Sequence, residues 1–167
     1  MVYINDHHKF IFIDNPKSGS TSITNALREA LGVPIPRGAP KDVHLTSAQI
    51  KEQWPDKWET YIKVTTFREP FRRFCSAVNF GSHYFNKYST IQELEEHIKS
   101  QTDCVYCLPQ EAFTDGCDFI IHLETVQKDF NMFCKKIGIE PVQVSVDNQK
   151  QTTRKFFNLE EVFHKLK

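Results

Sequence analysis

The segment from Phe10 to Leu31 constrains the fold of this chain more than any other. It opens with a short apolar run at residues 10–13, which is typical of a buried strand. A loop of small and polar residues follows, and then a helical pattern whose apolar residues share one stripe and end at Gly32. Such a junction forms an anion site, because backbone N–H groups point outward and the helix dipole favours negative charge. The segment therefore predicts a strand-loop-helix unit that binds a phosphorylated nucleotide.

The loop carries donors suited to a phosphate or a sulfate group. They are Lys17, Ser18, Gly19, Ser20, Thr21 and Ser22. The order differs from that of a Walker A loop, where the lysine stands at the helix start, because here the lysine precedes the glycine. Taken alone, the residues leave open a solvated Gly/Ser turn that happens to contain a lysine.

Length and charge limit the function classes. The 167 residues, with 40% apolar content, suit one domain spanning residues 1–167. Lysine plus arginine equals aspartate plus glutamate at 21 each, so no global basic field favours nucleic acid or a membrane surface as a partner. No apolar stretch approaches the length of a membrane span, and the first ten residues do not resemble a signal peptide. We expect a cytoplasmic protein, with a trimmed lumenal protein as the open alternative.

The five cysteines are interpreted as reduced thiols. Cys104 and Cys107, with Cys117 and His122, could form a zinc set. The segment between them supplies no second paired ligand motif, so scattered buried thiols and no bound metal are the favoured prediction.

Strand and helix patterns alternate along the rest of the chain. Further strands are predicted at 61–67 and 119–123, with a possible edge strand at 142–146. Helices are predicted from a Thr46/Gln49 cap to about residue 53, from Pro70 onward, at 90–100, at 125–137, and after a cap at Asn158. Loops or irregular structure are predicted at residues 33–42, 81–89 and 102–116. This alternation indicates an α/β fold with a mainly parallel sheet covered on both faces. Ligands of such sheets bind beyond the carboxyl ends of the strands, which is where the Lys17 loop must lie.

A second polar motif, at residues 66–76, also joins a strand to a helix. It places Arg68 at the carboxyl end of the strand and Ser76 about two turns into the helix. A guanidinium fork suits a phosphate dianion because it donates two parallel charge-assisted hydrogen bonds. Pairing of Arg68 with Glu69 or another nearby carboxylate is the alternative.

The two motifs together resemble those of sulfotransferases that use 3′-phosphoadenosine 5′-phosphosulfate (PAPS). The run P-K-S-G-S-T-S is similar to the family's 5′-phosphosulfate loop, closest to that of its carbohydrate-type members. Arg68, Pro70, Arg73 and Ser76 match the 3′-phosphate motif R-[DN]-P-x-x-R-x-x-S, from which Glu69 departs. The resemblance continues more weakly through residues 118–139 and ends in the loop at 147–155.

The resemblance implies a three-layer α/β/α, P-loop-like sulfotransferase fold that uses PAPS as donor and needs no metal. It assigns Lys17 to catalysis and to donor binding, and residues 18–22 to the 5′-phosphate. Arg68 and Ser76 would hold the 3′-phosphate, with added contacts from Arg154 and Lys155, whereas Arg73 would be structural. The implied acceptor is a hydroxyl group, on a glycan or another small hydroxylated molecule.

The general base has two candidates. His44 lies between the two motifs, where several relatives carry a catalytic histidine, and a histidine titrates in the range suited to removing a hydroxyl proton. Glu124 is the rival, although a glutamate at a helix start is often only a partner of the helix dipole. We favour His44.

Two other functions stay open. A small P-loop kinase of a nucleoside or metabolite is disfavoured by the position of Lys17 and by the lack of an evident magnesium motif. A binding module that kept the nucleotide site without turnover is disfavoured by the intact motif residues. The sequence leaves the acceptor's identity and the oligomeric state undetermined.

Overall fold

The computed structural model describes residues 2–34, 44–80, 91–100, 105, 108–146 and 159–165. The chain divides into two compact units, one comprising residues 1–68 and 109–147 and the other residues 69–108 and 148–167. A single domain over 1–167 stays a prediction.

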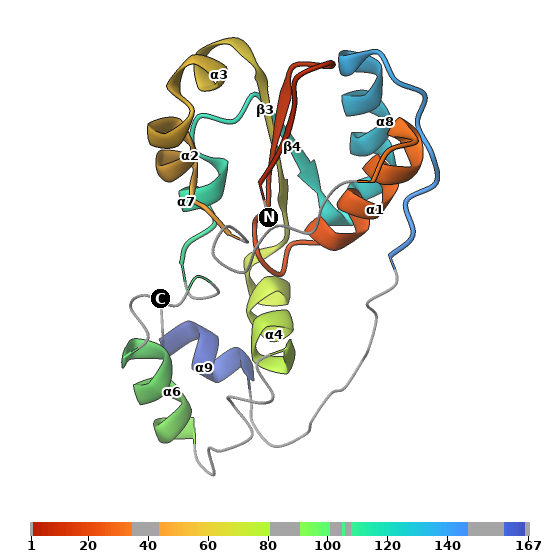
Figure 1. Ribbon diagram of the computed structural model, residues 1–167. Helices are drawn as coiled ribbons and strands as arrows, with labels where there is room; N and C mark the ends of the chain where they lie inside the picture. The colour runs from red at the N-terminus through yellow and green to blue at the C-terminus, as the bar shows by residue number, and fades with distance from the viewer. Residues whose placement is uncertain are drawn as a thin grey trace. The chain divides into compact units, whose positions relative to one another are not determined.

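A four-stranded sheet forms the centre of the first unit (Figure 1). Its strands lie in the order β1 (Tyr3–Asn5), β2 (Phe10–Ile13), β3 (Ile62–Phe67) and β4 (Phe119–His122). β2, β3 and β4 run parallel, and β1 is antiparallel to β2. The carboxyl ends of β2 and β3 are therefore neighbours at one edge of the sheet.

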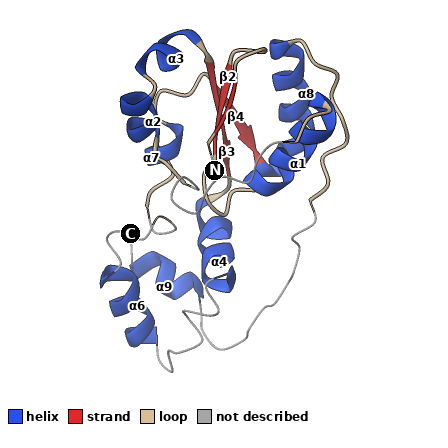
Figure 2. Cartoon of the chain, viewed as in Figure 1, coloured by secondary structure: helices blue, strands red, loops and turns tan. Residues whose placement is uncertain are grey.

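Helices cover both faces of this sheet (Figure 2). All four residues of β2 are buried, as expected for a strand enclosed on both sides. Phe10 and Phe12 belong to a core cluster with residues of α1 (Ser20–Leu31) and α8 (Val126–Ile137). Alternation along the strand turns Ile11 and Ile13 to the other face. That face is covered by α2 (Ser47–Gln53), α3 (Pro55–Thr60) and α7 (Glu111–Thr114). The three-layer α/β/α prediction is confirmed.

Glycine, capping and proline signals mark the ends of four helices. Gly32 and Gly138 adopt left-handed backbone conformations after α1 and α8 and donate their N–H groups to carbonyls of the last turn. Thr46 and Gln49 form a reciprocal capping box at the start of α2. Pro55 follows the end of α2 and also begins α3, because proline is well accommodated in a first helical turn.

The edge-strand prediction for residues 142–146 is wrong, since they form no strand. Gln127 of α8 satisfies the backbone there, donating to the Val142 carbonyl at 3.0 Å and accepting from the Val144 N–H at 2.8 Å. Val144 is buried in the core cluster, so the segment packs through a side chain and a helix instead of a ladder. The edge beside β2 is taken by β1, which the sequence pattern did not indicate.

The second unit contains the helices α4 (Pro70–Phe80), α6 (Ile91–Ser100) and α9 (Leu159–Lys165). Phe163 packs against Phe71 and Phe74, with ring centroids 5.4 Å and 5.5 Å apart. Asn158, the predicted cap of the last helix, lies outside the described residues, as do the predicted loop at 81–89 and most of that at 33–42. Across the described ranges, no helix has both the length and the apolar character to cross a bilayer.

Candidate nucleotide site

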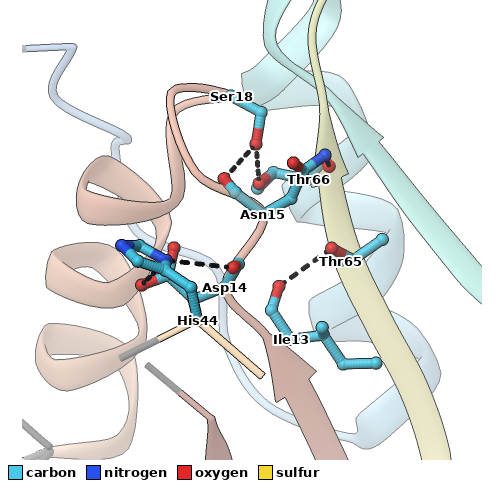
Figure 3. Close-up of polar contacts among 7 residues, drawn as sticks. All are labelled: Ile13, Asp14, Asn15, Ser18, His44, Thr65 and Thr66. Carbon is cyan, nitrogen blue, oxygen red and sulfur yellow. Dashed lines mark hydrogen bonds and ion pairs between the residues drawn. The ribbon is translucent and has the colours of Figure 1, made fainter. Parts of the chain in front are cut away.

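The loop between β2 and α1 is held from inside the protein (Figure 3). The buried Ser18 hydroxyl donates to the Asn15 carbonyl at 2.6 Å and lies 2.5 Å from the Thr66 hydroxyl of β3. The Asn15 side-chain amide, also fully buried, donates to the Thr66 carbonyl at 2.8 Å. The Ser18 hydroxyl thus anchors the loop from inside the protein, and the assignment of Ser18 to the 5′-phosphate stays a prediction.

Two left-handed residues shape the turn. Lys17 has φ of 64° and Gly19 has φ of 92°. A Cβ atom at position 19 would lie 2.5 Å from Cδ1 of Leu123, the first residue of a 3₁₀ turn (Leu123–Thr125) after β4. The backbone conformation therefore favours glycine here, and a larger residue would also require the Leu123 side chain to shift.

The positive end of the α1 helix dipole lies at this turn. Gly19 is the N-cap of α1, makes no side-chain capping bond, and is followed by a first turn without acidic residues. Ser20 and Ser22 are buried, whereas Thr21 is exposed. The Ser22 N–H already bonds to the Gly19 carbonyl at 3.1 Å. An anion would thus meet the leading N–H groups of the helix and the Thr21 hydroxyl.

Lys17 is half-buried beside this helix start. Burial, together with the positive charge of Arg68, lowers the pKa of Lys17 to about 8. The cations of the two motifs are therefore close enough to repel one another. An anion bound between them would relieve that repulsion.

The backbone of Arg68 is fixed by a buried glutamine, Gln110. The Gln110 amide donates to the Arg68 carbonyl at 2.8 Å, and its oxygen accepts from the Arg68 N–H at 3.1 Å. The same oxygen accepts from the Asn15 amide at 3.2 Å. The Lys17 loop and the Arg68 junction are thus joined by side-chain hydrogen bonds at the carboxyl edge of the sheet.

His44 lies against the start of the same loop (Figure 3). Its Nδ1 is 3.3 Å from the Asp14 carbonyl oxygen and 3.5 Å from Asp14 Oδ2. Burial raises the pKa of the Asp14 carboxyl, but the hydrogen bond from His44 and neighbouring positive charge outweigh burial and hold that pKa below its ordinary value. An ionised carboxylate therefore faces one nitrogen of the imidazole ring.

Comparison with known proteins gives one family match. Residues 1–87, just over half of the 167, match the sequence model of the sulfotransferase family. This chain belongs to the sulfotransferase family. No curated protein and no solved structure matches it. Membership supports an enzyme that transfers a sulfuryl group to an acceptor, and such enzymes generally take it from PAPS.

In this sulfotransferase, the rest of the second motif lies in the second unit. Glu69 caps α4, because its carboxylate accepts the N–H groups of Phe71 at 3.0 Å and of Arg72 at 2.8 Å. The departure from Asp or Asn at this position thus keeps a capping function. Arg73 is buried and donates to the Leu108 carbonyl at 2.9 Å, in keeping with a structural role, and Ser76 is half-buried in α4.

The remaining predicted residues are placed as follows. Glu124 is exposed in the 3₁₀ turn after β4. Arg154 and Lys155 lie outside the described residues, as do Cys104 and Cys107. Cys117 and His122 are described, and within the described part of the sulfotransferase no group of three or more metal-ligating side chains is found. Burial raises the pKa of the Cys117 thiol to about 12, which disfavours the thiolate form.

Sequence analysis missed three residues of this site, namely Asp14, Asn15 and Gln110. Asp14 and Asn15 lie between the apolar run at 10–13 and the Lys17 loop, where nothing in the local sequence marks them as site residues. Gln110 fell in a stretch expected to be irregular, and it stands 42 residues from its partner Arg68. Its neighbour Pro109 and the short helix that follows are weak local signals. Only tertiary structure shows what the glutamine contacts.

Proposed function

We propose that this chain transfers the sulfuryl group of PAPS to an acceptor hydroxyl on a carbohydrate. One observation carries the proposal: two strand-to-helix junctions, each with a cation, lie at neighbouring carboxyl ends of β2 and β3 and are bridged by hydrogen bonds. A donor with phosphate groups on both the 5′ and the 3′ positions needs two such cation-bearing sites. Family membership supports the same reading.

The Lys17 loop fits the 5′ end of the donor. The left-handed residues turn the backbone into an uncapped helix start, which favours an anion. Lys17 would neutralise the charge that builds on the bridging oxygen as the sulfuryl group leaves. Such electrostatic stabilisation is commonly the largest single contribution to transfer chemistry.

Arg68 is the proposed partner of the 3′-phosphate. Its guanidinium is always charged and matches two phosphate oxygens. The contributions of Ser76, Arg154 and Lys155 to the same phosphate stay predictions from the family resemblance.

His44 is the proposed base. The carbonyl and carboxylate oxygens of Asp14 both lie near Nδ1, which favours the tautomer with its proton on that nitrogen. Nε2 then carries the lone pair. In the proposed step the acceptor oxygen bonds to sulfur, the bond from sulfur to the 5′-phosphate oxygen breaks, and the acceptor proton passes to Nε2 of His44. The leaving nucleotide is 3′,5′-ADP.

Nucleotide binding tests the donor assignment. Titration calorimetry should show tighter binding of 3′,5′-ADP than of 5′-AMP or of ATP with magnesium. A preference for magnesium ATP, with consumption of ATP in the absence of PAPS, would indicate a kinase instead.

Transfer of labelled sulfate from PAPS to a panel of glycans tests the chemistry. The His44→Ala variant should lose about 10²–10⁴-fold in turnover, because general base catalysis contributes that much, and should bind 3′,5′-ADP within about twofold of wild type. The Glu124→Gln variant is the matched control and should keep its turnover. Full activity in His44→Ala, or loss in Glu124→Gln alone, would reverse the assignment of the base. Tight binding of 3′,5′-ADP without transfer to any acceptor would indicate a binding module.

A further inference from the structure

Gln110 forms hydrogen bonds both to Asn15, beside the Lys17 turn, and to the backbone of Arg68. It stands directly before α7 and is 5% exposed. Its amide nitrogen and oxygen bind the carbonyl and the N–H of the same residue, Arg68, at 2.8 Å and 3.1 Å. This two-point contact fixes both the position and the orientation of the Arg68 backbone.

The other end of the bridge is Asn15, the last residue before the Lys17 turn. Its amide donates to Gln110 at 3.2 Å and to the Thr66 carbonyl at 2.8 Å, and its own N–H donates to the Ile13 carbonyl at 3.1 Å. Its carbonyl accepts from Ser18. The turn is therefore tied to β3 through Asn15, and Gln110 connects Asn15 to Arg68.

The chemistry of the amide explains why glutamine is suited to this place. A primary amide carries a donor and an acceptor side by side, so it can bind the N–H and the carbonyl of a single residue at once. Buried amides that bind backbone groups are costly to replace, because the partner groups are left without hydrogen bonds. The three hydrogen bonds of Gln110 thus connect the Arg68 backbone to Asn15, directly before the Lys17 turn.

We propose that Gln110 is a positioning residue that sets the spacing between the Lys17 turn and Arg68, and thereby selects a nucleotide phosphorylated at both the 5′ and the 3′ positions. The inference rests on the proposed function, in which the turn binds the 5′ end and Arg68 the 3′-phosphate. Gln110 itself touches neither phosphate. Its effect is expected in discrimination between nucleotides and not in affinity for the 5′-phosphate alone.

The test compares binding of 3′,5′-ADP and 5′-AMP to the full chain by titration calorimetry, in wild type and in Gln110→Met. Methionine has nearly the same length and no charge, so only the hydrogen bonds are removed. The preference for 3′,5′-ADP should fall about tenfold in Gln110→Met, with 5′-AMP affinity within about twofold of wild type, as expected for loss of roughly one well-placed charged contact.

Gln127→Met is the matched control. Gln127 also bridges a backbone carbonyl and a backbone N–H through its amide, but it does so on Val142 and Val144. Its replacement should lower thermal stability and leave the nucleotide preference unchanged. An unchanged preference in Gln110→Met, or an equal loss for both nucleotides, would overturn the inference. A wild-type protein without any preference for 3′,5′-ADP would instead overturn the proposed function.

A measurement on the wild-type protein keeps the inference testable if Gln110→Met does not fold. A fixed spacing predicts that 2′,5′-ADP, which has the same charge but a displaced second phosphate, binds at least about tenfold more weakly than 3′,5′-ADP. Equal binding of the two isomers would show that the spacing is not fixed, while a shared preference over 5′-AMP would leave the donor class intact.

Discussion

The pKa of Lys17 depends on the burial of its side chain and on the charge of a neighbouring residue. Lys17 has a left-handed backbone, and burial with the charge of Arg68 lowers its pKa to about 8. The lysine is therefore positively charged at neutral pH and loses that charge within the alkaline range in which the protein can be studied. Its ordinary pKa would put this change well beyond that range.

Affinity for 3′,5′-ADP should fall as pH rises through about 8. The phosphates are fully ionised above pH 7, so the loss reflects deprotonation of Lys17 in the free protein. With a pKa of about 8, only one lysine in about eleven is charged at pH 9, which predicts roughly tenfold weaker binding than at pH 7. Titration calorimetry at pH 7, 8 and 9 measures the change.

The Lys17→Arg variant is the control for this prediction, because arginine stays charged and its profile should be flat between pH 7 and 9. A wild-type profile as flat as that of the variant would contradict the assignment. The free energy of unfolding without ligand should change with pH in the opposite direction. Between about pH 8 and 10.5, Lys17 is less protonated in the folded than in the unfolded chain. Its charge therefore destabilises the fold below pH 8, and this penalty is relieved as pH rises through that window.

The charged residues of the candidate site were easier to predict from the sequence than its hydroxyl contacts. Lys17 and Arg68 were predicted from the order of the two motifs, and the structure brings their charges close enough to interact. The direction of the Ser18 hydroxyl was not predictable, because it depends on Thr66 of a neighbouring strand, 48 residues away. The Asp14 contact of His44 was missed for the same reason.

The start of α1 depends on glycine at position 19. Gly19→Ala should destabilise the fold by about 2–4 kcal/mol, from left-handed strain of about 1–2 kcal/mol and from crowding against Leu123. Urea unfolding measures the loss.

The other end of α1 offers the matched control. Gly32 also has a left-handed backbone, but nothing lies within 4 Å of a Cβ atom placed there. Gly32→Ala should therefore cost only the strain, about 1–2 kcal/mol. Adding Leu123→Ala to Gly19→Ala should recover the crowding part. Equal costs at both glycines would contradict the close approach of Leu123.

Elements with strong local patterns were predicted, and those fixed by distant partners were not. The buried run of β2, the capping box of α2 and the glycine ends of α1 and α8 have local causes. β1 has three residues and depends on pairing with β2, and α7 has four residues, so neither presents a usable period. The stretch at 142–146 has the composition of a strand, but Gln127 and burial of Val144 satisfy it without a ladder.

The whole chain should unfold as one body. Its two units are connected by three passages of the chain, and the family's second motif begins in the first unit at Arg68 and ends in the second at Ser76. We expect one calorimetric transition, with equal calorimetric and van't Hoff enthalpies. A hundredfold excess of 3′,5′-ADP over its Kd should raise the Tm by about 5–10 °C, since it adds about 2.7 kcal/mol to a chain of this size. Two resolved transitions, of which the ligand moves only one, would show that the units are separate domains.

The inward brace of Ser18 and Asn15 has a kinetic consequence. A turn that is already tied to the strand behind it does not have to be ordered when a nucleotide arrives, so little conformational entropy is lost on complex formation. We therefore expect the rate of nucleotide binding to be set by diffusional encounter, and differences in affinity between nucleotides to lie mainly in their dissociation rates.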